Sequence, residues 1–283
     1  NFVWIGNGSR FDLGRLVALD GCMENVLSLL AALSGVMSLN AGIVETSVTY
    51  EEGGVKLEGF HAYDDGFDGK RPGILIIHQW TGLTDYEKMR ARMLAELGYN
   101  VFAADVYGIG IRPQPPDSGE EAGKYKTDRE LYRARMLAGL DVLMKDERTD
   151  TGKVAAIGYC FGGTGVLELA RAGTKLAGVV SFHGVLAPGD GMGAQAGKIP
   201  AKVLCLHGAI DPYVPAAEVE AFKKEMSDAR ADWQLTMYGG AVHAFTQKMA
   251  GDDISRGAAY NAKADERSWE DMQQFFAEIF VES

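Results

Sequence analysis

Cysteine is scarce in this sequence of 283 residues, which contains only Cys22, Cys160 and Cys205. The odd number and the wide spacing match neither a zinc site nor a disulfide framework. We therefore expect free thiols, no bound metal, and a reducing compartment such as the cytoplasm. A lone cysteine in a globular protein is usually a small buried hydrophobe, so the question is whether one of the three has a chemical role.

Positive charge is also in deficit, since 28 Lys and Arg face 39 Asp and Glu and the net charge is 28 − 39 = −11. This balance disfavours nucleic acid and anionic membrane surfaces as partners. The chain has no G-x-G-x-x-G and no P-loop, which argues against nucleotide-dependent chemistry, and we expect no cofactor. With 47% hydrophobic residues, the composition is that of a globular protein long enough to bury its own core.

Long apolar runs are lacking too. The run 26–37 has 12 residues, fewer than the roughly 20 that cross a bilayer, so we expect no membrane insertion. Its length suits an export signal, although residues 23–25 carry no positive charge and 39–41 form a poor cleavage site. Residues 1–43 are therefore interpreted as an N-terminal extension, either signal-like or disordered, and residues 44–283 as a single domain. Export by such a signal is the alternative to a cytoplasmic location.

From residue 47 onward, short strands alternate with helices. A hairpin is expected around Gly53-Gly54, and the continuous apolar run 73–78 is typical of a strand buried on both faces. The predicted strands are 47–51, 55–63, 73–78, 99–104, 153–158, 176–182, 201–206 and 233–238; the predicted helices are 84–97, 128–145, one beginning near 160, 215–228 and 265–280. A Pro- and Gly-rich loop is expected at 108–123. This order predicts an α/β fold with a mostly parallel, doubly wound sheet flanked by helices on both faces.

A candidate nucleophile follows one of these strands. Strand 153–158 leads into Gly158-Tyr159-Cys160-Phe161-Gly162-Gly163, a G-x-C-x-G sequence at a strand-to-helix turn. A sharp turn of this kind presents its central side chain at the carboxyl edge of the sheet, and the helix N-terminus beside it favours a thiolate. The Phe161 amide is then placed to bind a developing oxyanion. Taken alone, the motif is equally compatible with a Gly-rich turn around a buried cysteine.

Asp211 and His243 are candidate partners for Cys160. Each lies in a loop after a predicted strand, and the chain order of nucleophile, acid and histidine is that of α/β-hydrolases. Taken singly, Asp211 is a turn residue before Pro212 and His243 an ordinary loop histidine. Together, at three strand ends in this order, they predict a Cys-His-Asp triad.

The chain from about Val44 to Phe280 resembles the dienelactone hydrolase family, the cysteine-nucleophile branch of the α/β-hydrolase fold. The resemblance rests on the segments 77–83, 104–108, 158–163, 207–215 and 243–245. It implies that Cys160 is the nucleophile, His243 the base and Asp211 its orienting carboxylate. It also implies an oxyanion hole formed by the Trp80 and Phe161 amides, and cofactor-free, carboxymethylenebutenolidase-type hydrolysis of lactones and esters through a thioester.

Two positions depart from the family pattern. Gln79 stands where family enzymes often carry a Glu that partners the resting thiol, and an amide cannot take the thiol proton. Ala244 stands where well-studied lactonases have a Ser that helps to bind the substrate carboxylate. Arg129 or Arg133 is a candidate for that carboxylate, with surface ion pairing as the alternative for both. The natural substrate therefore need not be a dienelactone.

The remaining candidates are pocket-lining residues at strand ends and sheet-edge loops. They are His78, Trp80, Tyr107, His183 and Tyr213, with a hydrogen-bonded structural role as the alternative for the two histidines. We expect a small-molecule ester or lactone substrate and a monomer or homodimer. Three other hypotheses compete: a non-catalytic binding module, a general esterase or thioesterase with an unrelated substrate, and a thiol redox protein using Cys160 with Cys205.

Overall fold

The computed structural model describes residues 42–281. The signal-like segment predicted within residues 1–43, and Cys22 with it, lies outside these residues. The strands are β1 (Ile43–Glu52), β2 (Val55–Asp64), β3 (Arg71–Ile77), β4 (Asn100–Ala104), β5 (Thr149–Tyr159), β6 (Gly178–Phe182), β7 (Lys202–Gly208) and β8 (Trp233–Tyr238). The helices are α2 (Asp85–Glu96), α3 (Asp117–Thr127), α4 (Arg129–Lys145), α5 (Phe161–Arg171), α6 (Ala216–Asp228) and α7 (Ala262–Val281), with short 3₁₀ turns at Lys248–Ala250 and Ile254–Arg256. Within this part of the chain, no helix has both the length and the apolar character to span a bilayer.

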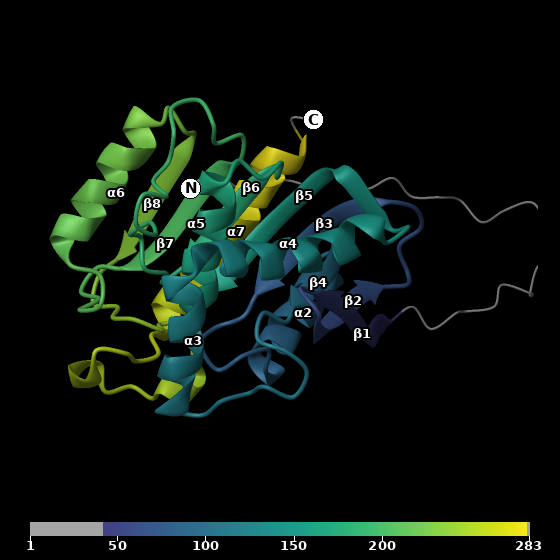
Figure 1. Ribbon diagram of the computed structural model, residues 1–283, viewed down its shortest axis with the longest axis horizontal. Coiled ribbons are helices and arrows are strands. Elements are labelled where there is room, and N and C mark those ends of the chain that lie inside the picture. Colours follow the sequence, from purple (N-terminus) through teal and green to yellow (C-terminus); the bar gives the residue numbers. More distant parts are fainter. Residues whose placement is uncertain (1–41, 282–283) are drawn as a thin grey trace, which may run out of the picture. The chain divides into compact units, whose positions relative to one another are not determined.

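The strands form one eight-stranded sheet in the order β1-β2-β4-β3-β5-β6-β7-β8 (Figure 1). The β1–β2 hairpin is antiparallel and β2 pairs antiparallel with β4, whereas every pairing from β4 to β8 is parallel. This confirms the predicted mostly parallel sheet. Because parallel strands share a direction, the loops after β3, β5, β7 and β8 all leave from the same edge.

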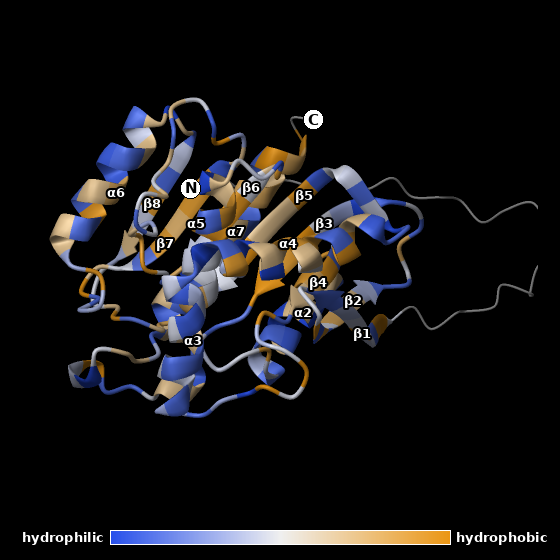
Figure 2. Cartoon of the chain, viewed as in Figure 1, coloured by the Kyte–Doolittle hydropathy of each residue, from blue (hydrophilic) through white to orange (hydrophobic). Residues whose placement is uncertain are grey.

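Helices cover both faces of the sheet, as predicted. On β3, Leu75 and Ile77 face one apolar cluster, which includes side chains from α3, α4, α5 and α6, whereas Ile74 and Ile76 face a second cluster with α2 and α7. This alternation explains why β3 reads as a continuous apolar run, since a strand covered on both faces has no solvent side. Figure 2 shows the result: hydrophobic colours on the central strands and mixed colours on the helices.

Helix α2 begins with a complete N-terminal cap. Thr84 caps the helix, and its capping box with Glu87 is complete: the Thr84 side chain accepts from the first helical turn while Glu87 accepts from the Thr84 N–H at 2.8 Å. A capping box of this kind satisfies N–H groups that a helix start leaves without partners. Glu87 is fully buried, which places a carboxylate directly beneath the loop that precedes the helix.

The prediction of a loop at 108–123 is wrong in its second half, because α3 begins at Asp117. Pro116 directly precedes the helix, where its missing N–H costs nothing, and the acidic residues of the first turn and Lys124 and Lys126 of the last complement the helix dipole. Ser118, Ala122 and Tyr125 are buried at the spacing of one helix face. The prolines and glycines of this segment concealed that periodicity.

Candidate active site

Cys160 lies in a strained turn between β5 and α5. Its backbone has φ 55° and ψ −112°, a conformation that side-chain-bearing residues rarely adopt. The glycines around it are needed for steric reasons: a Cβ on Gly158 would overlap the Gly162 carbonyl, and one on Gly162 would overlap the carbonyl of Ile77. The G-x-C-x-G sequence therefore folds into the sharp turn that was predicted, and the Cys160 side chain is partly exposed at the carboxyl edge of the sheet.

The structure brings Cys160, His243 and Asp211 together from three different strand ends. The His243 Nε2 lies 3.0 Å from the Cys160 Sγ, and the His243 Nδ1 lies 2.9 Å from the Asp211 Oδ2. The Asp211 side chain is fully buried, and its other oxygen accepts the Tyr213 N–H at 2.8 Å. Asp211 therefore has one oxygen held by the backbone and the other directed at the imidazole.

Electrostatics favour an ion pair between the sulfur and the imidazole. Burial opposes ionisation of Cys160, but the charge of His243 and its hydrogen bond outweigh this effect and lower the pKa of the thiol. Burial also opposes a charge on His243, but the Cys160 charge and the bond to Asp211 raise the pKa of His243 to about 10. Both shifts act in the same direction, toward a thiolate beside an imidazolium.

Two further groups stabilise the thiolate. One is the Phe161 N–H in the first turn of α5, whose interaction with the sulfur lowers the pKa of the thiol. The other is the positive charge of Lys126, an exposed residue in the last turn of α3. Sequence reasoning missed Lys126 because it assigned only residues 108–123 to a loop and left 124–127 unassigned. The buried spacing of Ser118, Ala122 and Tyr125 was the signal that could have found this helix.

Buried side chains hold the loop that carries Trp80. The His78 Nδ1 donates to the Gln79 carbonyl at 2.6 Å, and the Gln79 N–H donates to Glu87 at 3.3 Å. The Tyr107 hydroxyl donates to the Trp80 carbonyl at 3.0 Å. The Trp80 N–H itself has no acceptor within residues 42–281. Neighbouring backbone groups are thus fixed while the Trp80 donor stays available.

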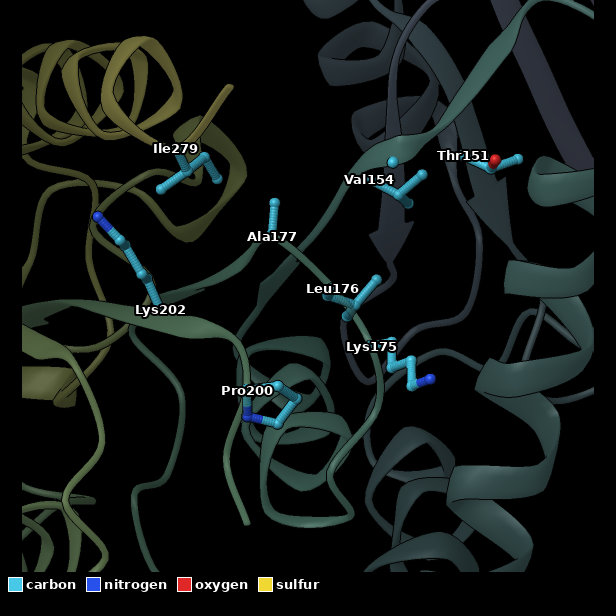
Figure 3. A pocket seen from close by; sticks show the side chains of 9 residues that line it. Thr151, Val154, Lys175, Leu176, Ala177, Pro200, Lys202 and Ile279 are labelled. Atoms are coloured by element: carbon cyan, nitrogen blue, oxygen red, sulfur yellow. The ribbon is translucent and has the colours of Figure 1, made fainter. Parts of the chain in front are cut away.

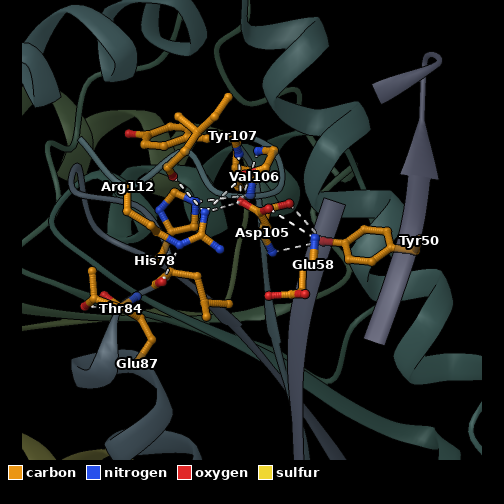
Figure 4. A network of polar contacts seen from close by, with 12 residues as sticks. Tyr50, Glu58, His78, Thr84, Glu87, Asp105, Val106, Tyr107 and Arg112 are labelled. Carbon is orange, nitrogen blue, oxygen red and sulfur yellow. Dashed lines mark hydrogen bonds and ion pairs between the residues drawn. The ribbon is translucent and has the colours of Figure 1, made fainter. Parts of the chain in front are cut away.

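The network in Figure 4 anchors this loop to the neighbouring strand ends. The Asp105 carboxylate accepts the N–H groups of Glu58, Tyr107 and Gly108. The Val106 N–H donates to the His78 Nε2 at 3.1 Å, so His78 carries its proton on Nδ1. Burial lowers the pKa of His78 to about 4, which keeps the ring neutral in this role.

Several candidates are buried or already paired with other side chains. His78 is 0% exposed and Tyr107 2%, so both support the Trp80 loop from beneath rather than lining a pocket. Arg133 donates to the buried Glu168 at 2.8 Å, which commits its charge to an ion pair. Arg129 is buried at the start of α4, and its Nε and Nη1 have no partner among residues 42–281.

Other candidates are partly exposed or contact Cys160 or His243. The Trp80 side chain is 37% exposed and that of Tyr213 54%. The Tyr213 ring packs edge-on against His243, with 5.3 Å between ring centroids. Gln79 is half-buried beside Trp80. His183 is fully buried, and its Nδ1 accepts the Cys160 N–H at 3.1 Å, so it contacts the turn from inside the protein.

The hollow in Figure 3 lies at the other edge of the sheet. Its volume is about 420 Å³, and it lies at the amino ends of β5, β6 and β7 against the last turns of α7. Lys175, Leu176 and Pro200 are among its lining residues. Because Cys160 follows the carboxyl end of β5, this hollow does not adjoin the thiol.

On the oxyanion role that the family resemblance implies for the Trp80 N–H, we expect Tyr107→Phe to lower kcat about 10-fold while KM for an ester changes less than about 2-fold, since one such donor is worth about 10²–10³ when removed outright. The substitution frees the Trp80 carbonyl and loosens that donor without removing it. Steady-state kinetics on p-nitrophenyl acetate measure both constants. Tyr63→Phe, a half-buried tyrosine of β2, is the matched control and should leave kcat unchanged. A parent-like kcat in Tyr107→Phe would show that this hydroxyl does not position Trp80.

Comparison with known proteins assigns the chain to a family. The model of the dienelactone hydrolase family matches residues 57–280. The chain belongs to this family. The family and the eight-stranded sheet confirm the predicted α/β-hydrolase fold, and the protein is a hydrolase acting on ester bonds of small molecules.

Similar proteins cover most of the chain. A solved dienelactone hydrolase-like promiscuous phosphotriesterase from metagenomic libraries is 38% identical, with a TM-score of 0.79 over 84% of this chain and 99% of that one. The "Putative carboxymethylenebutenolidase" of Yersinia pestis is 24% identical over 259 residues, which are 84% of this chain and 89% of the relative. Protein usf of Aquifex pyrophilus is 28% identical over 246 residues, 83% and 98% of the two chains.

Proposed function

We propose that this dienelactone hydrolase family member cleaves carboxylic esters and lactones, a carboxymethylenebutenolidase-type activity, through a thioester on Cys160. The observation that carries the proposal is the continuous contact from sulfur to carboxylate: 3.0 Å from Cys160 to His243 and 2.9 Å from His243 to Asp211. An activated nucleophile, its base and a third group that orients the base are the elements of covalent acyl transfer.

In the first step, the Cys160 thiolate attacks the ester carbonyl and a tetrahedral oxyanion forms. The amides of Phe161 and Trp80 are its proposed donors, and one such donor is worth about 3 kcal/mol of transition-state stabilisation. Phe161 is supported by its N–H at the start of α5 directly after Cys160, which lowers the pKa of the thiol. Trp80 is supported by the clamped loop that leaves its N–H without a protein acceptor in residues 42–281.

His243 then changes its role because the sulfur loses its charge. The raised pKa of His243 depends on the adjacent thiolate and on Asp211. Once the sulfur is bonded to the carbonyl carbon, the thiolate contribution disappears and the pKa of His243 falls. The imidazolium therefore gives its proton to the departing alcohol or enol oxygen as the tetrahedral intermediate collapses to the acyl thioester. The neutral imidazole that remains can take a proton from water, and the hydroxide formed releases the acid and restores the thiolate.

The nucleophile also selects the substrate by its leaving group. A thiolate of lowered pKa is itself a good leaving group, so a tetrahedral intermediate with a poor alkoxide expels sulfur instead. Activated esters and enol lactones, whose oxygen leaves as a stabilised anion, are the proposed substrates. Of the two arginines considered for a substrate carboxylate, Arg133 is paired with Glu168, which leaves Arg129 as the candidate.

The experiment is to trap the thioester. Mixing the protein with p-nitrophenyl acetate and quenching in acid should add the mass of one acetyl group, and peptide mapping should place it on Cys160. Cys205 is the internal control, because burial raises the pKa of its thiol to about 12 and it should stay unlabelled. Steady turnover by the parent with no label on Cys160, together with turnover that persists in Cys160→Ala, would overturn the proposal. A folded protein that turns over neither this ester nor a dienelactone would favour the binding-module alternative.

A further inference from the structure

A chain of buried hydrogen bonds links the loop of Cys160 to the loop of His243. The Cys160 N–H is shared between the Phe182 carbonyl at 2.9 Å and the His183 Nδ1 at 3.1 Å. On the other side of the ring, the His183 Nε2 lies 2.8 Å from the Thr246 Oγ1. Thr246 follows His243 by three positions and is itself buried. His183 therefore bridges two segments at different strand ends, one 23 and the other 63 positions away from it in sequence.

The direction of these bonds follows from their donors. Because the His183 Nδ1 accepts a backbone N–H, the ring proton is on Nε2, which donates to the Thr246 hydroxyl oxygen. Burial, and the nearby His243, keep the pKa of His183 well below its ordinary value, so the ring stays neutral and this tautomer persists. A protonated His183 could not accept the Cys160 N–H.

Thr246 is fixed from the far side. The Tyr86 hydroxyl donates to the Thr246 Oγ1 at 2.8 Å, and Arg90 of the same helix α2 reaches the Thr246 carbonyl at 3.5 Å. Arg90 is in turn paired with Asp265 of α7. The Thr246 hydroxyl thus lies between His183 and the helices α2 and α7, which pack on one face of the sheet.

The backbone on both sides of this bridge is held in unusual conformations. Cys160, His183 and Ala244 all have positive φ, at 55°, 41° and 56°. Non-glycine residues keep such conformations only where the surrounding contacts over-determine them. The His183 ring also packs edge-on against the His243 ring, with 5.3 Å between centroids and 65° between planes. One side chain therefore touches both the backbone of the thiol residue and the imidazole.

We propose that His183 and Thr246 are positioning residues, which hold the Cys160 sulfur and the His243 Nε2 in contact by tying their two loops together. The inference rests on the proposed function, in which this sulfur and this imidazole act as nucleophile and base. Neither residue touches the reacting atoms, so their effect should appear in chemistry and in thiolate formation rather than in substrate binding.

The experiment removes the Thr246 hydroxyl and measures two properties of the Cys160–His243 pair: its kcat and the pH dependence of Cys160 alkylation. We expect Thr246→Val to lower kcat on p-nitrophenyl acetate about 10- to 100-fold with KM within about 2-fold, since small misplacements of catalytic groups cost this much. The pH at which Cys160 reaches half of its maximal rate of alkylation by iodoacetamide should rise, because a displaced imidazole stabilises the thiolate less. Thr246→Ser, which keeps the hydroxyl, should restore most of kcat and the parent pH profile. Tyr86→Phe removes only the outer donor to Thr246 and should change kcat far less than Thr246→Val.

The outcomes separate this inference from the proposed function. A folded Thr246→Val protein with the parent kcat and alkylation profile would overturn the positioning role while the parent still acylates Cys160. A parent protein that acylates no cysteine would overturn the proposed function itself. If Thr246→Val does not fold, His183→Asn decides, because it keeps an acceptor for the Cys160 N–H but cannot reach Thr246. Parent-like kcat in that variant would exclude the bridge, and a lowered kcat with a raised alkylation midpoint would support it.

Discussion

Replacing Cys160 with alanine is expected to lower kcat/KM for activated esters by about 10⁴-fold or more, because the loss of a covalent nucleophile leaves only binding and oxyanion contacts. Alanine keeps the backbone of the turn but removes the sulfur that His243 contacts at 3.0 Å. The reaction of the variant would have to use water directly, without a thioester. Initial rates over a range of ester concentrations measure the ratio, and circular dichroism checks that the strained turn still folds.

Cys160→Ser separates the nucleophile from the site around it. A serine hydroxyl stays protonated at neutral pH, so the charge that raises the pKa of His243 is lost and no resting ion pair forms. We expect activity above that of Cys160→Ala but at least about 10²-fold below the parent, since a protonated hydroxyl is a weaker nucleophile than the thiolate that this site stabilises. Cys205→Ala is the matched control: this thiol is buried in β7, away from His243, and the variant should keep the parent kcat. Parent-like rates in Cys160→Ala would mean that another group attacks the ester.

The grouping of Cys160, Asp211 and His243 was predictable from the sequence because each of them lies beside a local signal. Cys160 is flanked by glycines that only a sharp turn requires, and Asp211 and His243 follow the strands predicted at 201–206 and 233–238. In a parallel sheet, such strand ends meet at one edge whatever the distance along the chain. The contact between Cys160 and His243, 83 positions apart, therefore followed from topology and needed no knowledge of side-chain packing.

The supporting residues were harder to predict, because their roles depend on packing between distant segments. Thr246 has no distinguishing neighbours in sequence, and its link to His183 exists only once β6 and the His243 loop are side by side. Tyr107 was expected in the pocket, and His78 either in the pocket or in a hydrogen-bonded structural role. Both turn inward, where backbone groups of the Trp80 loop need partners. The strand-end rule places a residue at the edge of a sheet, but it does not say whether the side chain faces substrate or protein.

Asp211→Asn is expected to lower kcat/KM about 10³- to 10⁴-fold, the size of effect that a wrong imidazole tautomer produces. The Asp211 Oδ1 accepts the Tyr213 N–H, so the asparagine oxygen takes that position and its amide NH₂ faces the His243 Nδ1. That nitrogen must then accept, which leaves the proton of the neutral ring on Nε2, facing the sulfur. The imidazole can no longer withdraw a proton from the thiol.

The same substitution should change thiolate formation, which gives a second measurement. Without the Asp211 charge and hydrogen bond, the pKa of His243 falls and the pKa of the Cys160 thiol rises. Since iodoacetamide reacts with thiolate, the alkylation rate of Cys160 at neutral pH should drop and its midpoint should move to higher pH. Asp141→Asn, on the exposed side of α4, is the matched control and should alter neither quantity. An unchanged midpoint with a lowered kcat would mean that Asp211 acts after the thiolate has formed, in the release of the leaving group or the attack of water.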